Sequence, residues 1–153
     1  SWNARLAEGR AAEIVAEARR RGLSKVLALG TSEDLAALAD AARFERDPGL
    51  ARLALLSQRR RFPGSPRAAE ASFLLGRLDD AADDRSTRAL GWYDQYLNEA
   101  PGGVYVSEAL GRKMMVLERS GSHTAATRIA REYLQRFPGG TYSRAARALV
   151  HEP

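Results

Sequence analysis

The amino-acid sequence predicts an all-α protein, in which antiparallel helix hairpins stack into an α-solenoid. The first observation is that Pro63, Pro101 and Pro138 recur at intervals of 38 and 37 residues, a period typical of stacked supersecondary units. The second is that an amphipathic run with helical spacing of its apolar residues precedes each proline. The third is that alanine stands at the same distance after each proline, at Ala71, Ala109 and Ala146.

Each repeat unit is expected to contain a helix, a turn, a second helix and a proline stop. The first helices are expected over residues 32–46, 66–80 and 104–119, and the second helices over 48–61, 86–99 and 123–136. A closing helix is expected over 141–150, and an extra short helix over 22–31. A partial unit precedes them, with Trp2 and Leu6 from its first helix, Gly9 at its turn, and Ile14 and Ala18 facing inward. The whole chain is interpreted as one domain, divided into 1–31, 32–64, 65–102, 103–139 and 140–153.

The segment Pro63-Gly64-Ser65-Pro66 predicts a compact stop and restart between two helices. Proline disfavours helical geometry in the residue before it, and Gly64 can adopt the left-handed conformation common after a helix end. Ser65 can accept hydrogen bonds from the first amides of the next helix, and Pro66 suits the first helical position. Thr31, with Asp34 three residues later, predicts another helix start.

Composition limits the classes of function. The 153 residues are 44% hydrophobic and 28% charged and include no cysteine, which excludes disulfides, zinc thiolates and thiol nucleophiles. Of the histidines, His123 stands at a helix start and His151 near the C-terminus. No motif for metal, nucleotide or serine-hydrolase chemistry occurs. The sequence therefore predicts a protein that is not an enzyme, with no cofactor and no metal.

The chain begins at Ser1, and its methionines are Met114 and Met115. A processed or excised chain is therefore expected, so that a signal peptide or membrane anchor would lie outside it.

The repeat positions resemble those of the tetratricopeptide repeat (TPR) family. In the first unit they are Leu35, Leu38, Ala39, Ala51, Leu55 and Pro63. In the second they are Leu75, Gly76, Ala89, Tyr93, Tyr96 and Pro101. In the third they are Leu110, Met114, Leu117, Ala126, Tyr133 and Pro138. The resemblance implies a right-handed solenoid, and Gln58 departs from it by standing where a small residue is expected.

The resemblance also implies a concave surface lined by the first helices, which would bind another protein or an extended peptide. The residues it places there with a partner-binding role are Arg43, Phe44, Glu70, Phe73, Arg77, Glu108, Met115 and Arg119. The arginines would pair with acidic groups of the partner and the glutamates with basic groups. The alternative interpretation is that Phe44 and Phe73 pack between helices.

Three charged segments and one tryptophan have competing interpretations. The arginine runs 19–21 and 59–61 end predicted helices, where cations interact favourably with the helix dipole; a phosphate or lipid-headgroup patch is the alternative. The acidic residues Asp79, Asp80, Asp83 and Asp84 lack calcium-loop spacing, and a solvated turn is expected, with Asp84 or Ser86 capping the next helix. Trp92 is either an exposed candidate contact for a partner on the convex side or a side chain that fills the gap left by an inserted residue in the second repeat unit.

The linkers with Pro-Gly-Ser or Pro-Gly-Gly are similar to those of bacterial envelope TPR proteins, of the outer-membrane assembly lipoprotein and Tol-Pal coordinator types. This likeness implies a periplasmic or cell-envelope scaffold, with the cytoplasm as the alternative and with membrane attachment only through an anchor outside the chain. A second hypothesis is a sensory TPR domain of a FecR-like or anti-sigma-type signalling protein. Binding to nucleic acid is disfavoured despite the net charge of +5, because no aromatic residues are interleaved with the arginine runs.

Overall fold

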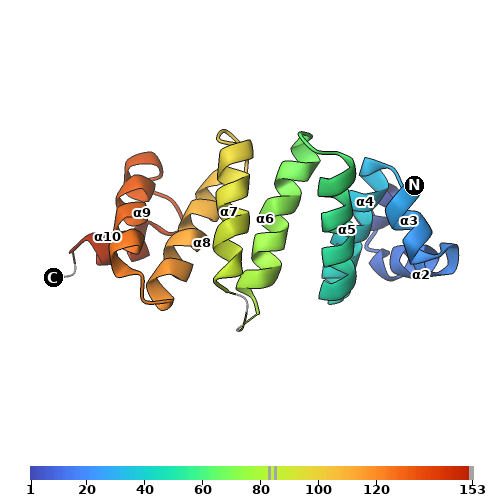
Figure 1. The fold of residues 1–153 in the computed structure, drawn as a ribbon, viewed down its shortest axis with the longest axis horizontal. Helices are drawn as coiled ribbons and strands as arrows, with labels where there is room; N and C mark the ends of the chain where they lie inside the picture. Colours follow the sequence, from blue (N-terminus) through green and yellow to red (C-terminus); the bar gives the residue numbers. More distant parts are fainter. Residues whose placement is uncertain (83, 85, 152–153) are drawn as a thin grey trace. The chain divides into compact units, whose positions relative to one another are not determined.

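The computed structural model describes residues 1–82, 84 and 86–151, and these form α-helices and no strand (Figure 1). The all-α prediction is therefore confirmed for the described residues. The helices are α1 (Trp2–Ala7), α2 (Ala11–Arg21), α3 (Leu23–Leu29), α4 (Ser32–Phe44), α5 (Pro48–Arg61), α6 (Pro66–Asp80), α7 (Arg88–Glu99), α8 (Val106–Arg119), α9 (His123–Arg136) and α10 (Ser143–His151).

The helices group into two compact units, Ser1–Ala71 and Ser72–Pro153. In the first unit, α4 packs against α1, α2 and α5, and α3 packs against α2 and α5. In the second unit, α8 packs against α7 and α9, and α9 packs against α10. Neighbouring helices thus pack in pairs within each unit, as hairpins joined by short turns require.

The N-terminal part of the first unit follows the predicted partial repeat. Trp2, Ile14 and Ala18 are buried, and Gly9 has a positive φ of 76° at the turn between α1 and α2. The predicted short helix is α3. Thr31 begins α4 as predicted, because its hydroxyl accepts a hydrogen bond from the amide of Asp34 at 3.0 Å.

The joint between α5 and α6 has the predicted stop-and-restart geometry. Gly64 has φ of 79°, the left-handed region that favours glycine. The Ser65 hydroxyl accepts from the amide of Ala68 at 3.1 Å and donates to the carbonyl oxygen of Phe62 at 2.7 Å. One serine side chain therefore links the end of α5 to the start of α6, which begins at Pro66 as predicted.

Polar side chains of α5 hold the short helix α3 and the start of α4. Ser57 donates to the carbonyl oxygen of Leu27 at 2.6 Å, and Arg61 donates to the same oxygen at 3.0 Å. Gln58, which replaces an expected small residue, is buried and donates to the carbonyl oxygen of Ser32 at 3.0 Å. The departure at Gln58 is therefore accommodated by a backbone acceptor.

Two arginines of the run 59–61 donate hydrogen bonds to backbone carbonyl oxygens. Besides the bond from Arg61, Arg59 donates to the carbonyl oxygen of Ala68 at 2.7 Å. In the other run, Arg19 forms an ion pair with Asp47 at 2.7 Å, and the guanidinium of Arg21 lies 5.3 Å from the Trp2 ring centroid. These contacts favour the structural interpretation of both runs.

The two joints of the second unit repeat one hydrogen bond at an interval of 37 residues. The hydroxyl of Tyr96, in α7, accepts from the amide of Tyr105 at 2.9 Å. The hydroxyl of Tyr133, in α9, accepts from the amide of Tyr142 at 3.0 Å. Both tyrosine side chains are buried, so each places its hydroxyl at the start of the following helix from inside the core.

Both joints also need glycine beside that hydroxyl. A Cβ atom added to Gly103 would lie 2.2 Å from the Tyr96 hydroxyl, and one added to Gly140 would lie 2.2 Å from the Tyr133 hydroxyl. The two glycines of each pair that follows Pro101 or Pro138 therefore have different surroundings. The second glycine of each pair is required for close approach, whereas the first has open space around its Cα.

The helix bounds differ from prediction mainly at the starts of three helices. α8 begins at Val106 rather than residue 104 and α10 at Ser143 rather than 141, because the tyrosine hydroxyls hold the preceding amides in a turn. α7 begins at Arg88 rather than 86. The prediction that Asp84 or Ser86 caps α7 is wrong, because Thr87 occupies the N-cap position and no side chain caps it.

The repeated joint predicts different costs for two neighbouring substitutions. Gly103→Ala should lower the free energy of unfolding by about 1–3 kcal/mol, because the added methyl group must displace a buried, hydrogen-bonded hydroxyl. Gly102→Ala, the matched control, should change it by less than about 0.5 kcal/mol, because its Cβ meets nothing within 4 Å. Urea denaturation of the two variants measures the difference. Equal stabilities would contradict the assigned role of Gly103.

Candidate functional site

The residues with a predicted partner-binding role lie in both compact units. Arg43, Phe44 and Glu70 belong to the first unit, and the other five belong to the second. Arg43, at the end of α4, forms an ion pair with Asp40 at 3.2 Å. The Phe44 side chain is 73% exposed, so it does not pack between helices. Glu70 is half-buried on α6.

Phe73 is a core residue, so it is not available as a partner contact. It is 1% exposed, and its ring stacks on Tyr105 with centroids 4.4 Å apart and planes 4° apart. Tyr93 and Tyr96 also lie within 6.0 Å of the Phe73 ring. The alternative interpretation is therefore the right one for Phe73, and the expectation of a partner-binding role is wrong.

The equivalent position one repeat later is Gly111, and this substitution changes what the neighbouring tyrosine does. A Cβ atom at Gly111 would lie 2.2 Å from the Tyr142 ring, so the ring occupies the space that a side chain would fill. From there the Tyr142 hydroxyl donates to the carboxylate of Glu108 at 3.0 Å. Tyr105 is stacked on Phe73, whereas Tyr142 contributes a hydroxyl to a polar cluster.

Asp80 is the centre of that polar cluster. Its side chain is 8% exposed, and its carboxylate accepts from the hydroxyl of Tyr93 at 2.8 Å. Arg119 donates to the same carboxylate, and Arg112 lies 3.6 Å from it. These contacts join the C-terminal end of α6 to α7 and to two turns of α8. A partner-pairing role for Arg119 stays a prediction, but its guanidinium already has a carboxylate within the chain.

Glu108 is the second carboxylate of the cluster. It accepts from Arg112 at 2.8 Å, four residues along α8, and from Tyr142 at 3.0 Å. Arg112 thus lies between Glu108 and Asp80. Sequence reasoning missed Arg112 and Tyr142, although the four-residue spacing of Glu108 and Arg112 is the standard spacing of a helical ion pair.

One stripe of α8 carries these groups together with an exposed apolar side chain. Residues 108, 112, 115 and 119 follow one another by three or four positions, so they share a face of the helix. Met115 is 36% exposed within this stripe. We call the set formed by this stripe and the facing residues of α6 the α6–α8 face; its members are Arg77, Asp80, Glu108, Arg112, Met115 and Arg119.

Arg77 differs from the other arginines of the α6–α8 face. It is half-buried on α6, three residues before Asp80, but the Asp80 carboxylate is taken by α7 and α8. Among the residues that the structure describes, Arg77 makes no hydrogen bond and no ion pair. Its positive charge lowers the pKa values of Tyr93 and Tyr142, against the larger effect of burial.

The electrostatics of the cluster favour the neutral form of both tyrosines. Burial, and then the hydrogen bond to Asp80, raises the pKa of Tyr93 far above its usual value. Burial, and then the hydrogen bond to Glu108, raises the pKa of Tyr142 to about 12. Each hydroxyl therefore remains a proton donor to a carboxylate over the physiological pH range.

Of the acidic residues for which the sequence predicts a solvated turn, Asp84 is exposed in a turn before α7, whereas Asp79 and Asp80 lie in a helix. Asp79 and Asp80 belong to the last turn of α6, and Asp79 is buried. The indole of Trp92, half-buried on α7, donates to Asp79 at 3.1 Å. Trp92 therefore fills the interface between α6 and α7. Asp83 lies outside the described residues.

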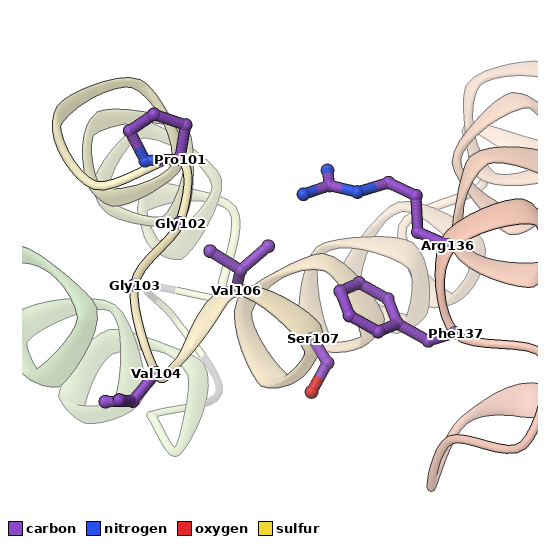
Figure 2. Close-up of a pocket in the computed structure, with 8 residues that line it drawn as sticks. All are labelled: Pro101, Gly102, Gly103, Val104, Val106, Ser107, Arg136 and Phe137. Atoms are coloured by element: carbon purple, nitrogen blue, oxygen red, sulfur yellow. The ribbon is translucent and has the colours of Figure 1, made fainter.

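A small pocket of about 240 Å³ lies elsewhere in the second unit. Figure 2 shows that the loop before α8 and the start of α8 form one side, and Arg136 and Phe137 the other. The Arg136 guanidinium pairs with Glu132 at 3.0 Å and lies 5.4 Å from the centroid of the Phe137 ring. The polar group that faces this pocket is therefore already neutralised by an ion pair within α9.

Metal binding finds no support in the described residues, which contain no cluster of three or more side chains able to hold an ion. No helix in the described ranges is long and apolar enough to cross a membrane. The chain matches no protein-family model and no curated protein.

The raised pKa of Tyr142 predicts a stability change at high pH. The folded-state value of about 12 exceeds the value of about 10 for an unfolded chain, so the folded state holds this proton longer. Its stabilising contribution is therefore complete below about pH 10 and is lost as pH rises through about 12. Urea unfolding over this range should show a steeper loss of stability for the wild type than for Tyr142→Phe.

The same variant supplies a direct check on the titration. The difference between the tyrosinate absorbance titrations of the wild type and Tyr142→Phe isolates this hydroxyl. A midpoint near the ordinary tyrosine value would contradict the burial of this hydroxyl and its hydrogen bond to Glu108.

Proposed function

We propose that this chain is a non-catalytic protein-interaction module that binds an extended segment of another protein along the α6–α8 face. We further propose that its hairpins form a TPR-like, right-handed solenoid, and that it acts as a scaffold or adaptor in a bacterial envelope. The tyrosine–amide bond repeated at 37 residues supports the repeat architecture, because it recurs at equivalent positions of successive hairpins.

The observation that carries the binding proposal is the exposed apolar side chain of Met115 within a rigid charged stripe. Methionine adapts its shape to different apolar partners, and the ion pairs around it fix the surrounding side chains. Asp80 accepts from Tyr93 of α7 and from Arg119 of α8, and Glu108 accepts from Arg112 of its own helix and from Tyr142. A partner segment would therefore meet a preorganised surface, which lowers the entropy cost of binding.

The length of the stripe sets the kind of segment that fits. α8 has 14 residues, which corresponds to about 21 Å, the reach of about six residues of extended chain. A short linear peptide is therefore sufficient to contact the whole stripe.

The proposal predicts that a substitution at Met115 weakens peptide binding. A displayed library of random peptides longer than the stripe would be selected on the wild-type chain. Met115→Glu should weaken binding of the selected peptides by about tenfold or more, because it removes an apolar contact and adds a charge.

The matched control is Val104→Glu, which makes the same kind of change at an exposed apolar residue of the loop before α8. That variant should bind the peptides like the wild type. Failure to select any peptide, or equal weakening by both substitutions, would contradict binding at the α6–α8 face.

A further inference from the structure

The three arginines of the α6–α8 face differ in whether a carboxylate of the chain accepts their hydrogen bonds. Arg112 and Arg119 both contact Asp80, and Arg112 also contacts Glu108. Arg77 has no acceptor among the described residues. The face thus holds three guanidinium groups against two carboxylates, and the excess positive charge belongs to Arg77.

Among the described residues, the neighbouring polar groups make no hydrogen bond to Arg77. The hydroxyl of Tyr93 donates to Asp80 and that of Tyr142 donates to Glu108, and the raised pKa of each tyrosine keeps it from supplying a phenolate. A guanidinium has five N–H donors and no acceptor. A half-buried guanidinium without a carboxylate beside it is therefore a ready site for an anion.

We propose that Arg77 binds a side-chain carboxylate, that of an aspartate or glutamate within the partner segment. This inference rests on the proposed function, and it deepens that function by naming the chemistry of the partner. An arginine binds a carboxylate through two parallel N–H···O bonds, which fix orientation as well as charge.

The position of Arg77 selects a side chain rather than a chain terminus. Arg77 and Met115 occupy equivalent positions of α6 and α8, 38 residues apart in the sequence. The charged stripe continues on α8 from Glu108 beyond Met115 to Arg119. In this proposal the segment reaches Arg77 from within its length rather than from its end, so that the carboxylate offered there is a side chain. The partner segment therefore carries an acidic residue close to an apolar residue, with Met115 as the contact of the latter.

The probes are two pools of peptides of random sequence with amidated C-termini, one with a fixed central glutamate and one with a fixed central glutamine. Binding to the wild type should be about tenfold stronger for the glutamate pool, the effect expected of one charge-assisted hydrogen-bonded pair. Arg77→Gln should abolish this preference. Arg128→Gln removes the same charge from an exposed position on α9 and should leave the preference intact.

Two further arms make the outcome specific. Arg77→Lys keeps the charge but not the planar fork, so it should retain only part of the preference, and it serves in place of Arg77→Gln if that variant fails to fold. A third pool has a central glutamine and a free C-terminal carboxylate. If it binds the wild type as strongly as the glutamate pool, the assignment to a side chain is overturned.

The remaining results separate this inference from the proposed function. Equal binding of the two amidated pools, with weakening by Met115→Glu, overturns the carboxylate site and leaves the interaction face in place. A glutamate preference that survives Arg77→Gln, or that Arg128→Gln also removes, overturns the assignment to Arg77. Absence of binding by every pool overturns both proposals.

Discussion

The second compact unit depends on one recurring constraint, which is that each helix must restart in a fixed direction after a glycine-containing joint. The buried hydroxyls of Tyr96 and Tyr133 meet this constraint by accepting from the last amide of the joint, directly before the next helix begins. Glycine must stand beside each hydroxyl, because a Cβ atom would overlap it. The joint before α6 solves the same problem differently, with the Ser65 side chain bridging the two helix ends. At these three joints, one hydrogen-bonding side chain therefore links the preceding segment to the start of the next helix.

Features determined by local sequence were predictable, and these include the positive φ of Gly64 and the caps at Thr31 and Ser65. The site was less predictable, because its contacts join residues far apart in the chain. Arg119 reaches Asp80 across 39 positions, and neither residue's neighbours in sequence indicate that partner. Phe73 illustrates the same limit: an apolar residue on a first helix can face a partner or the core. In the folded chain the ring of Tyr105 stacks on Phe73, so Phe73 faces the core.

The polar cluster of the α6–α8 face depends on one difference between equivalent positions, which is phenylalanine at position 73 and glycine at position 111. Where α6 has Phe73, the following tyrosine stacks and takes no part in the polar cluster. Where α8 has Gly111, the ring of Tyr142 moves into the free space and its hydroxyl contacts Glu108. The bond from Tyr142 joins that from Arg112 on the same carboxylate. The absence of a side chain at Gly111 therefore lets the Tyr142 hydroxyl bind the Glu108 carboxylate.

In the proposed function, the pairing of charges within the chain would give the α6–α8 face its selectivity for a partner. Five charged side chains scattered over a surface would attract many partners weakly, because exposed ion pairs contribute little. Here Asp80 and Glu108 are held by arginines and tyrosines from other parts of the unit, so they do not compete for the partner's groups. The α6 helix that presents Arg77 is itself tied to α7 by the bond between Trp92 and Asp79. In the proposed function, the guanidinium of Arg77 would discriminate by geometry, because a carboxylate must match its planar fork to form two parallel bonds.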